Sequence, residues 1–163
     1  MSEAVLTPTL DESRLVGLAE IVAEHLRPPM CVALYGDLGA GKSTFARALI
    51  RALMRDLAHE VPSPTFSLRQ DYAAPSGPVV HFDLYRIGDT GDLDELGFGE
   101  AQETAIAIVE WPERAGDVLP ADRLDVFLTE SASREERDVK LIGRGRAAAL
   151  VAAISAAVRR QKA

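Results

Sequence analysis

The chain is poor in the features that mark secreted and membrane proteins. It has a single cysteine, Cys31, among 163 residues, so no disulfide can form within it. Its longest apolar stretch, residues 147–158, is interrupted by Ser155 and is shorter than the roughly 20 residues that a membrane-spanning helix needs. Residues 1–10 contain no lysine or arginine, so we expect no secretory leader. These scarcities together predict a cytoplasmic protein with no membrane association.

Positive charge is also in short supply. Lysine and arginine total 18 against 25 aspartates and glutamates, which gives a net charge of −7. An acidic balance argues against independent binding to nucleic acid, because such binding depends on neutralising phosphates. Within residues 131–163 the balance reverses. That segment either faces an acidic partner or RNA, or forms a solvated helix and hairpin edge.

A glycine-rich segment near the first third of the chain carries the strongest signal. Residues 36–43, GDLGAGKS, fit the pattern G-x-x-x-x-G-K-[ST] at every fixed position. In such a loop the glycines let backbone N–H groups surround a phosphate, while a lysine reaches the β- and γ-phosphates and a hydroxyl can coordinate Mg²⁺. The pattern therefore predicts a nucleotide site in which Lys42 and Ser43 take these two roles.

The flanking residues supply the structural context that this motif needs. Residues 30–35 are an apolar run between Pro28-Pro29 and Gly36, which predicts a buried strand. Residues 43–53 place Phe45, Leu49 and Leu53 four positions apart, which predicts a helix with one apolar face. A strand, a glycine loop and a helix in this order favour anion binding, because the helix N-terminus adds partial positive charge.

The remaining residues alternate between helical and extended patterns. The spacing of Thr9 and Glu12 predicts a capping box, with Thr9 as N-cap, for a helix that ends before Pro28. The ranges that we predict as strands are 66–72, 79–84, 105–109, 123–129 and 137–142, with a turn at 75–78, helical pieces within 92–104 and a closing alanine-rich helix. The order predicts a single α/β domain with a mixed β-sheet flanked by helices.

Two acids are placed to complete a hydrolytic site. Hydrolysis of a nucleotide needs a carboxylate at the end of a strand beside the phosphate loop. Asp83 lies within VVHFDLYR, and Glu110 directly follows the apolar run 105–109. We expect Glu110 to hold the metal because its strand is the more completely buried, with Asp83 positioning water or supporting the metal shell. Either acid could instead cap an ordinary turn. The predicted catalytic residues are Lys42, Asp83 and Glu110, and the predicted metal ligands are Ser43 and Glu110.

Four other residues near these motifs have candidate roles. Thr65, in a proline-flanked loop, is either a sensor of the γ-phosphate and metal or a plain loop residue. Trp111 either walls the site, contacts a partner or belongs to the core. Arg86 is a candidate for neutralising transition-state charge, although we favour a structural salt bridge. We interpret His81 as structural.

The nucleotide base can also be predicted. Guanine-selective switches resemble one another in a late motif, Asn/Thr-Lys-x-Asp. This chain contains no asparagine, and none of its lysines, Lys42, Lys140 and Lys162, has an aspartate two positions later. ATP is therefore preferred over GTP.

The motifs together resemble those of one bacterial family. The set comprises GDLGAGKST at 36–44, SPTF at 63–66, HFDLYR at 81–86 and VEWPE at 109–113. It is similar to the TsaE family, also called YjeE, the ATPase component of the tRNA threonylcarbamoyladenosine pathway, and the similarity runs in order over residues 10–137. The resemblance implies a P-loop NTPase-type fold over the single domain 1–163, ATP and Mg²⁺ as ligands, and a TsaB–TsaD complex as partner, with tRNA reached through that complex.

The resemblance also carries over site residues. It implies that the metal is held by Ser43 and Glu110, and that Asp83 is a second acidic site position. A looser similarity covers residues 133–137, where Arg134 and Arg137 would approach the nucleotide or the partner. The residues that it implies for phosphate binding are Gly39, Ala40, Gly41, Lys42, Ser43 and Thr44.

Two other functions compete with a partner-dependent ATPase. A small-molecule P-loop kinase would need an acceptor pocket and usually an arginine-rich lid, and no lid is evident after Glu110. A nucleotide-binding adaptor without turnover would not need the lysine, hydroxyl and acids that are present. The chain has no evident arginine finger or water-positioning glutamine, so we expect slow hydrolysis that a partner accelerates.

Overall fold

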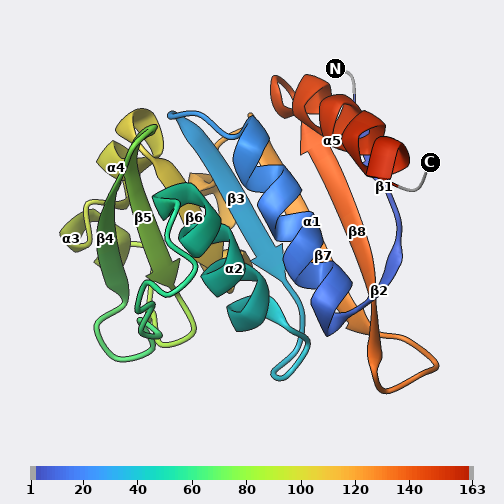
Figure 1. The fold of residues 1–163 in the computed structure, drawn as a ribbon. Coiled ribbons are helices and arrows are strands. Elements are labelled where there is room, and N and C mark those ends of the chain that lie inside the picture. The colour runs from blue at the N-terminus through green and yellow to red at the C-terminus, as the bar shows by residue number, and fades with distance from the viewer. Residues whose placement is uncertain (1–2, 162–163) are drawn as a thin grey trace.

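The computed structural model describes residues 3–161, and Figure 1 shows how its elements follow one another. The strands are β1 (Glu3–Leu6), β2 (Thr9–Asp11), β3 (Met30–Tyr35), β4 (Arg69–Ala74), β5 (Gly77–Asp83), β6 (Ile106–Glu110), β7 (Arg123–Glu130) and β8 (Glu136–Arg144). The helices are α1 (Glu12–His25), α2 (Lys42–Met54), α3 (Asp92–Glu95), α4 (Phe98–Thr104) and α5 (Ala147–Gln161), with a 3₁₀ segment η1 at Pro112–Val118.

All of these strands join one mixed sheet. Their order is β1-β8-β7-β3-β6-β5-β4, and β2 also pairs with β8. The central strands β5, β6, β3 and β7 are parallel, whereas β4, β8 and β1 pair antiparallel to their neighbours. This mixed sheet with flanking helices confirms the predicted fold class. Because β3, β5 and β6 run in parallel, their carboxyl ends meet at one edge of the sheet, and that edge carries the predicted site.

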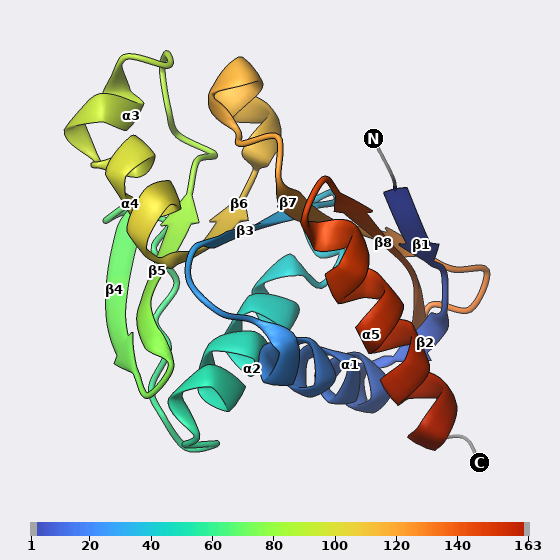
Figure 2. The same ribbon diagram turned by 90° about the horizontal axis from the view of Figure 1, so that it is seen from above.

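The sheet is covered on both faces. In Figure 2, α1, α2 and α5 lie on one side and α3, α4 and η1 on the other. Alternate residues of each strand point to opposite faces, so each strand contributes to both cores. On β5, Val79 packs into the core under α1 and α2, while Val80 and Phe82 pack with Phe98 of α4. The runs predicted to be buried strands, β3 and β6, are almost entirely buried.

The predicted start of the first helix is wrong. Asp11 caps α1, its side chain accepting a hydrogen bond from the Arg14 backbone N–H at 2.8 Å. Thr9 is the first residue of β2, and its hydroxyl donates to Asp138 Oδ1 at 2.6 Å. Both residue types favour helix caps, but only Asp11 directly precedes Glu12, the first residue of α1. The short strands β1 and β2 and the segment η1 were not predicted.

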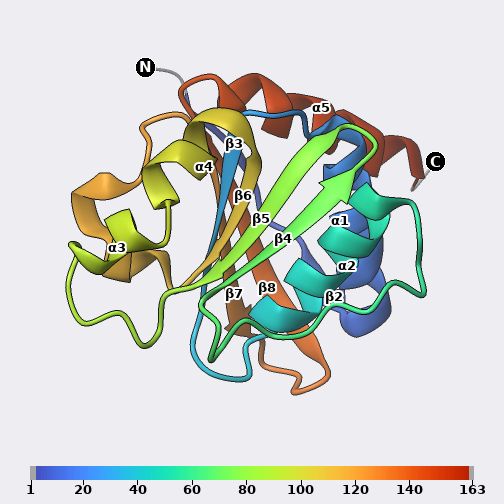
Figure 3. The ribbon, with the colours of Figure 1, turned by 90° about the vertical axis from the view of Figure 1, so that its left-hand side faces the viewer.

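The predicted strand 66–72 also begins too early. Phe66 is exposed and Leu68 has a positive φ of 67°, so the chain turns here before β4 starts at Arg69. Figure 3 shows the β4–β5 edge that results, with α2 on one side and α3 and α4 on the other. Within residues 3–161, none of the helices has the length and apolar character to cross a bilayer.

Candidate nucleotide site

The phosphate loop connects the centre of the sheet to the start of α2. β3 ends at Tyr35, and α2 begins at Lys42 with Gly41 as its N-cap, at a φ of 110° that L side chains rarely adopt. A side chain at Gly36 would place its Cβ 2.6 Å from the carbonyl oxygen of Leu128 on β7. Glycine is therefore required at both ends of the loop for conformational and steric reasons.

The first turn of α2 is open for an anion. The N-cap Gly41 has no side chain that could accept hydrogen bonds from the turn. The first N–H groups of a helix have no partner inside it, and their partial positive charge attracts phosphate. Lys42, Ser43 and Thr44 all line the adjoining cavity. The geometry is that of a phosphate site.

Lys42 lies buried at the base of this loop, with 5% of its surface exposed. Its ammonium group donates to the carbonyl oxygens of Gly36 and, at 3.0 Å, Asp37, and it lies 4.0 Å from the ring centre of Trp111. Burial lowers the pKa of Lys42 below its usual value, opposed chiefly by the charge of Glu110. These contacts hold the ammonium next to the place where phosphates would bind.

Ser43 and Glu110 come together although they lie on different elements. Glu110 ends β6, pairs in register with Leu34 of β3 and is 3% exposed. The Ser43 hydroxyl donates to Glu110 Oε1 at 3.1 Å. The two residues predicted as metal ligands are therefore adjacent. A hydroxyl and a carboxylate are oxygen ligands of the kind that Mg²⁺ prefers.

The second acid, Asp83, lies beside Glu110 at the end of β5. It pairs in register with Glu110 and is 6% exposed. Its Oδ1 accepts from the Tyr85 backbone N–H at 3.0 Å, and its Oδ2 from the Thr65 hydroxyl at a long 3.4 Å. The Thr65 hydroxyl is also 2.6 Å from that of Ser63. Thr65 and Asp83 thus form a small polar group next to the predicted metal ligands.

His81 also contacts the site, contrary to its interpretation as purely structural. Its Nε2 lies 2.6 Å from Glu110 Oε2, and both side chains are almost fully buried. The predicted strand placed His81 two residues before Asp83, so both belong to one face of β5. That spacing was the available signal, but the register between β5 and β6, which identifies Glu110 as its partner, cannot be read from spacing.

Aromatic side chains form one wall. Trp111 has a φ of 58°, and its ring centre is 4.8 Å from that of Tyr85. Arg86 lies 4.5 Å over the ring of the exposed Phe66. Among residues 3–161 no carboxylate lies within ion-pair distance of Arg86, so the favoured salt bridge is wrong.

The opposite wall comes from the β8 side. Arg137 donates from Nε to the Ala40 carbonyl oxygen at 3.0 Å and from Nη2 to that of Gly39 at 3.3 Å. Its Nη1 bonds to the Arg134 carbonyl oxygen, also at 3.0 Å. Arg137 therefore contacts the phosphate loop itself, and Arg134 lines the cavity beside it.

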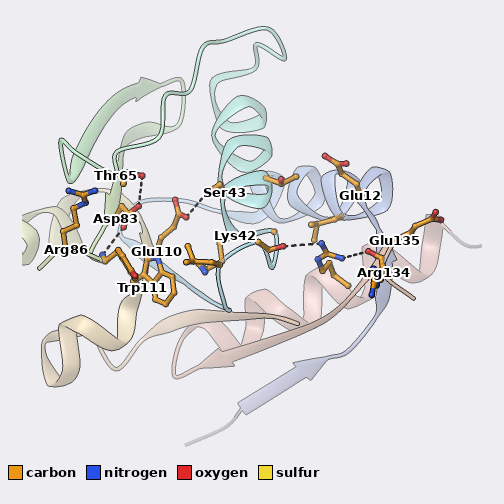
Figure 4. Close-up of a pocket in the computed structure, with 17 residues that line it drawn as sticks. Glu12, Lys42, Ser43, Thr65, Asp83, Arg86, Glu110, Trp111, Arg134 and Glu135 are labelled. Carbon is orange, nitrogen blue, oxygen red and sulfur yellow. Dashed lines mark hydrogen bonds between the residues drawn. The ribbon is translucent and has the colours of Figure 1, made fainter. Parts of the chain in front are cut away.

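One cavity of about 630 Å³ is lined by the phosphate loop, the two acids and both walls. Figure 4 shows Thr65, Asp83, Arg86, Glu110 and Trp111 at one end, Lys42 and Ser43 in the middle, and Glu12, Arg134 and Glu135 at the other end. The volume falls in the range of small-molecule and cofactor sites. Asp83 and Glu110, the two acids predicted for hydrolysis, lie at the opposite end of the cavity from Glu12 and Glu135.

The donor set fits a metal that is shared with a nucleotide. In the described part of the chain, no three His, Cys, Asp or Glu side chains are arranged to hold a metal ion by themselves. Mg²⁺ at phosphate-transfer sites keeps few protein ligands and completes its shell with phosphate oxygens and water. Ser43 and Glu110 match that kind of site.

Comparisons with known proteins agree with the geometry. The family described as "Threonylcarbamoyl adenosine biosynthesis protein TsaE" matches residues 9–139. A tRNA threonylcarbamoyladenosine biosynthesis protein TsaE from Rickettsia conorii is 38% identical over 68% of this chain, and the match spans 63% of the length of that relative. The protein of the same name from Haemophilus influenzae is 34% identical over 76% of this chain and 77% of its own. The crystal structure of Bacillus subtilis YdiB superposes with a TM-score of 0.74 at 25% identity, covering 95% of this chain and 97% of that one.

Proposed function

The chain belongs to the TsaE family of threonylcarbamoyl adenosine biosynthesis proteins, and on that premise we propose that it is the Mg²⁺-dependent, ATP-hydrolysing component of the machinery that forms N6-threonylcarbamoyladenosine in tRNA. The single sheet supports our proposal that residues 1–163 act as a single P-loop ATPase domain. The observation that carries the proposal is the contact between Ser43 and Glu110 at the N-terminus of α2.

The site residues divide the work of hydrolysis between them. We propose that the backbone N–H groups of residues 39–44 bind the β-phosphate and that Lys42 exchanges its loop carbonyl partners for phosphate oxygens. Ser43 and Glu110 would hold Mg²⁺, which when bound neutralises charge on the phosphate oxygens. Water attacks the γ-phosphorus, the bond to the β-γ bridging oxygen breaks, and ADP and inorganic phosphate leave.

Asp83 is the residue best placed to act on the attacking water. Its Oδ2 has one long hydrogen bond, from Thr65, whereas both oxygens of Glu110 have closer partners. In phosphoryl transfer the protein contributes mainly by positioning groups and stabilising charge. Asp83 would orient the water, and Thr65 would order around the γ-phosphate.

We propose a TsaB–TsaD complex as the partner, through which the protein would meet tRNA. Exposed apolar side chains beside the cavity support an interaction surface, with Leu38 76% and Phe66 81% exposed. The net charge of −7 supports indirect rather than independent contact with tRNA. We propose a cytoplasmic location, where tRNA is modified and where a free buried thiol such as Cys31 is usual.

The direct test is ATP turnover with and without Mg²⁺ in a matched pair of variants. Glu110→Gln keeps the shape and removes the charge, and we expect turnover to fall by at least about tenfold while ATP binding without Mg²⁺ is retained. Glu103→Gln makes the same change on the exposed surface of α4 and should behave as wild type. Normal turnover in Glu110→Gln would reject the assignment, and phosphate transfer to an added small molecule would favour a kinase.

A further inference from the structure

The side chain of His81 is buried in a setting that packing alone does not explain. It lies on the face of β5 that is covered by α2, two residues after Val79 of the core, and is 3% exposed. Its Nε2 contacts Glu110 Oε2 at 2.6 Å. Its Nδ1 has no hydrogen-bond partner among the described residues. A buried polar atom without a partner costs free energy that an apolar side chain at this position would avoid.

The contact with Glu110 indicates which nitrogen of His81 acts as the donor. A glutamate that ligates Mg²⁺ is ionised and can only accept hydrogen bonds, so we assign the donor role to the Nε2–H of His81. The partnerless Nδ1 of a neutral ring is then an unprotonated acceptor, which is less costly to bury than a charged donor. In this arrangement Glu110 Oε2 has a hydrogen-bond donor, whereas His81 Nδ1 is left without a partner among the described residues.

Each carboxylate oxygen of Glu110 therefore has its own hydrogen-bond partner. Oε2 of Glu110 accepts from His81, and Oε1 faces the Ser43 hydroxyl at 3.1 Å. A glutamate has three side-chain torsions, and a hydrogen bond to one oxygen restricts where the other can point. Hydrogen bonds to ligating carboxylates orient metal ligands in this way.

We propose that His81 is a positioning residue of the ATPase reaction, holding Glu110 so that Oε1 stays beside Ser43 where Mg²⁺ would bind. The inference rests on the proposed function and extends it, because it assigns a role to a residue outside the phosphate loop and the two acids. It also limits Glu110 to the metal, since the oxygen that could accept a proton from water already has His81 as its partner. Proton acceptance therefore falls to Asp83.

Replacing His81 by glutamine or by asparagine distinguishes the effect of its hydrogen bond to Glu110 from the effect of removing the imidazole ring. The side-chain NH₂ of glutamine lies about as far from the backbone as the Nε2 of histidine, whereas that of asparagine reaches only as far as Nδ1. His81→Gln can therefore still donate to Glu110, and His81→Asn cannot, although both are polar and similar in size. Thermal melting of both proteins measures any general loss of stability.

The measurement is ADP binding by calorimetry, with Mg²⁺ and with EDTA, together with turnover as a function of Mg²⁺ concentration. We expect His81→Asn to bind ADP in EDTA within about twofold of wild type. It should need about 10–100-fold more Mg²⁺ for half-maximal turnover and for Mg²⁺-dependent binding. His81→Gln should recover most of this loss.

The outcomes distinguish the inference from the function on which it rests. A wild-type protein without Mg²⁺-dependent binding or turnover would reject the proposed function and the inference with it. A normal wild type with an equally normal His81→Asn, or with Gln and Asn impaired alike, would reject the inference alone. Nitrogen-15 NMR of wild-type His81 tests it without any variant. We expect a proton on Nε2, and an unprotonated Nε2 would overturn the proposal even if His81→Asn fails to fold.

Discussion

The guanidinium of Arg137 on β8 donates a hydrogen bond of 3.0 Å to the carbonyl oxygen of Ala40 in the phosphate loop, 97 residues earlier in the chain. A trans peptide points its C=O and N–H in opposite directions. Holding the Ala40 carbonyl towards Arg137 therefore also sets the direction of the Gly41 N–H, which must point the opposite way. The second bond, to the Gly39 carbonyl oxygen, fixes the neighbouring peptide. The loop is thus shaped from outside as well as by its own glycines.

Replacing Arg137 should weaken nucleotide binding. Hydrogen bonds to a charged group contribute about 1.5–3 kcal/mol, so Arg137→Ala is expected to raise the dissociation constant for ATP by about tenfold or more. Arg137→Lys should recover only part of the loss, because an ammonium cannot reproduce the planar fork of donors. Arg146→Ala, which breaks an exposed pair with Asp122, is the control and should bind normally. Calorimetry measures all three, and tight binding by Arg137→Ala would contradict the role.

The buried charge of Lys42, which the proposed reaction needs, should lower the free energy of unfolding of the protein. Its pKa in the folded protein is lowered, mainly by burial, so its charged form is disfavoured by folding. Below both pKa values the charge destabilises the fold. As the pH rises towards the ordinary value of 10.5, the folded protein releases the proton first and gains stability.

Lys42→Met should therefore lose turnover without losing stability at neutral pH. Wild type should become more stable relative to Lys42→Met between neutral pH and about 10. Denaturant unfolding at several pH values, alongside ATP turnover, checks both statements. A Lys42→Met protein that turns over ATP normally would remove Lys42 from the mechanism, and a pH-independent stability difference would contradict the linkage.

Local patterns predicted the parts of this site that depend on local geometry. The phosphate loop and α2 are formed by neighbouring residues, and the apolar runs of β3 and β6 made their burial evident. Glu110 and Asp83 could be placed because the carboxyl ends of parallel strands meet at one edge.

The features that the sequence did not predict depend on contacts between strands that are far apart along the chain. The contacts of His81 with Glu110 and of Arg137 with Ala40 require the strand registers and the position of β8. The hydrogen bond from Thr9 to Asp138 depends in the same way on the position of β8. Spacing along a chain carries no information on which of two suitable residues a remote strand will contact.

Asp83 and Thr65 should affect hydrolysis more than binding. Asp83→Asn keeps the shape and can no longer accept a proton, so we expect turnover to fall by about 100-fold while the dissociation constant for Mg-ATP changes less than about threefold. Thr65→Val should lower turnover by about tenfold, and Thr65→Ser, which keeps the hydroxyl, should restore most of it. Single-turnover kinetics combined with calorimetry separates the two steps. Equal losses in binding and turnover would instead indicate a structural role.

The fluorescence of Trp111 should report the proposed movement of the Lys42 ammonium from the loop carbonyls to the phosphates. It is the only tryptophan, and the Lys42 ammonium lies 4.0 Å from its ring centre. When Lys42 turns to the phosphates, the charge next to the indole changes, so fluorescence emission should shift on adding Mg-ATP. In Lys42→Ala the response should be much smaller at saturating nucleotide. A flat signal from wild type under conditions where calorimetry shows binding would place Lys42 in the same position in both states.

The exposed residues beside the cavity should determine acceleration by the partner. An arginine finger supplied by another protein increases turnover by about 10³–10⁵. We therefore expect slow turnover alone and faster turnover with purified TsaB–TsaD from the same organism. Phe66 is 81% exposed under the guanidinium of Arg86 and does not line the cavity. Phe66→Ser should leave turnover of the isolated protein unchanged and reduce the acceleration at least about tenfold, because exposed aromatic residues often dominate interfaces.

A matched variant tests whether that effect belongs to this end of the molecule. Leu57 is 71% exposed but follows the C-terminus of α2, at the opposite end of that helix from the phosphate loop. Leu57→Ser removes a similar apolar area and should be accelerated as much as wild type. Turnover is measured over a range of TsaB–TsaD concentrations for all three proteins. Equal turnover of wild type with and without TsaB–TsaD would reject partner activation. Equal losses in Phe66→Ser and Leu57→Ser would mean that exposed apolar area in general, rather than the surface beside the nucleotide, contacts the partner.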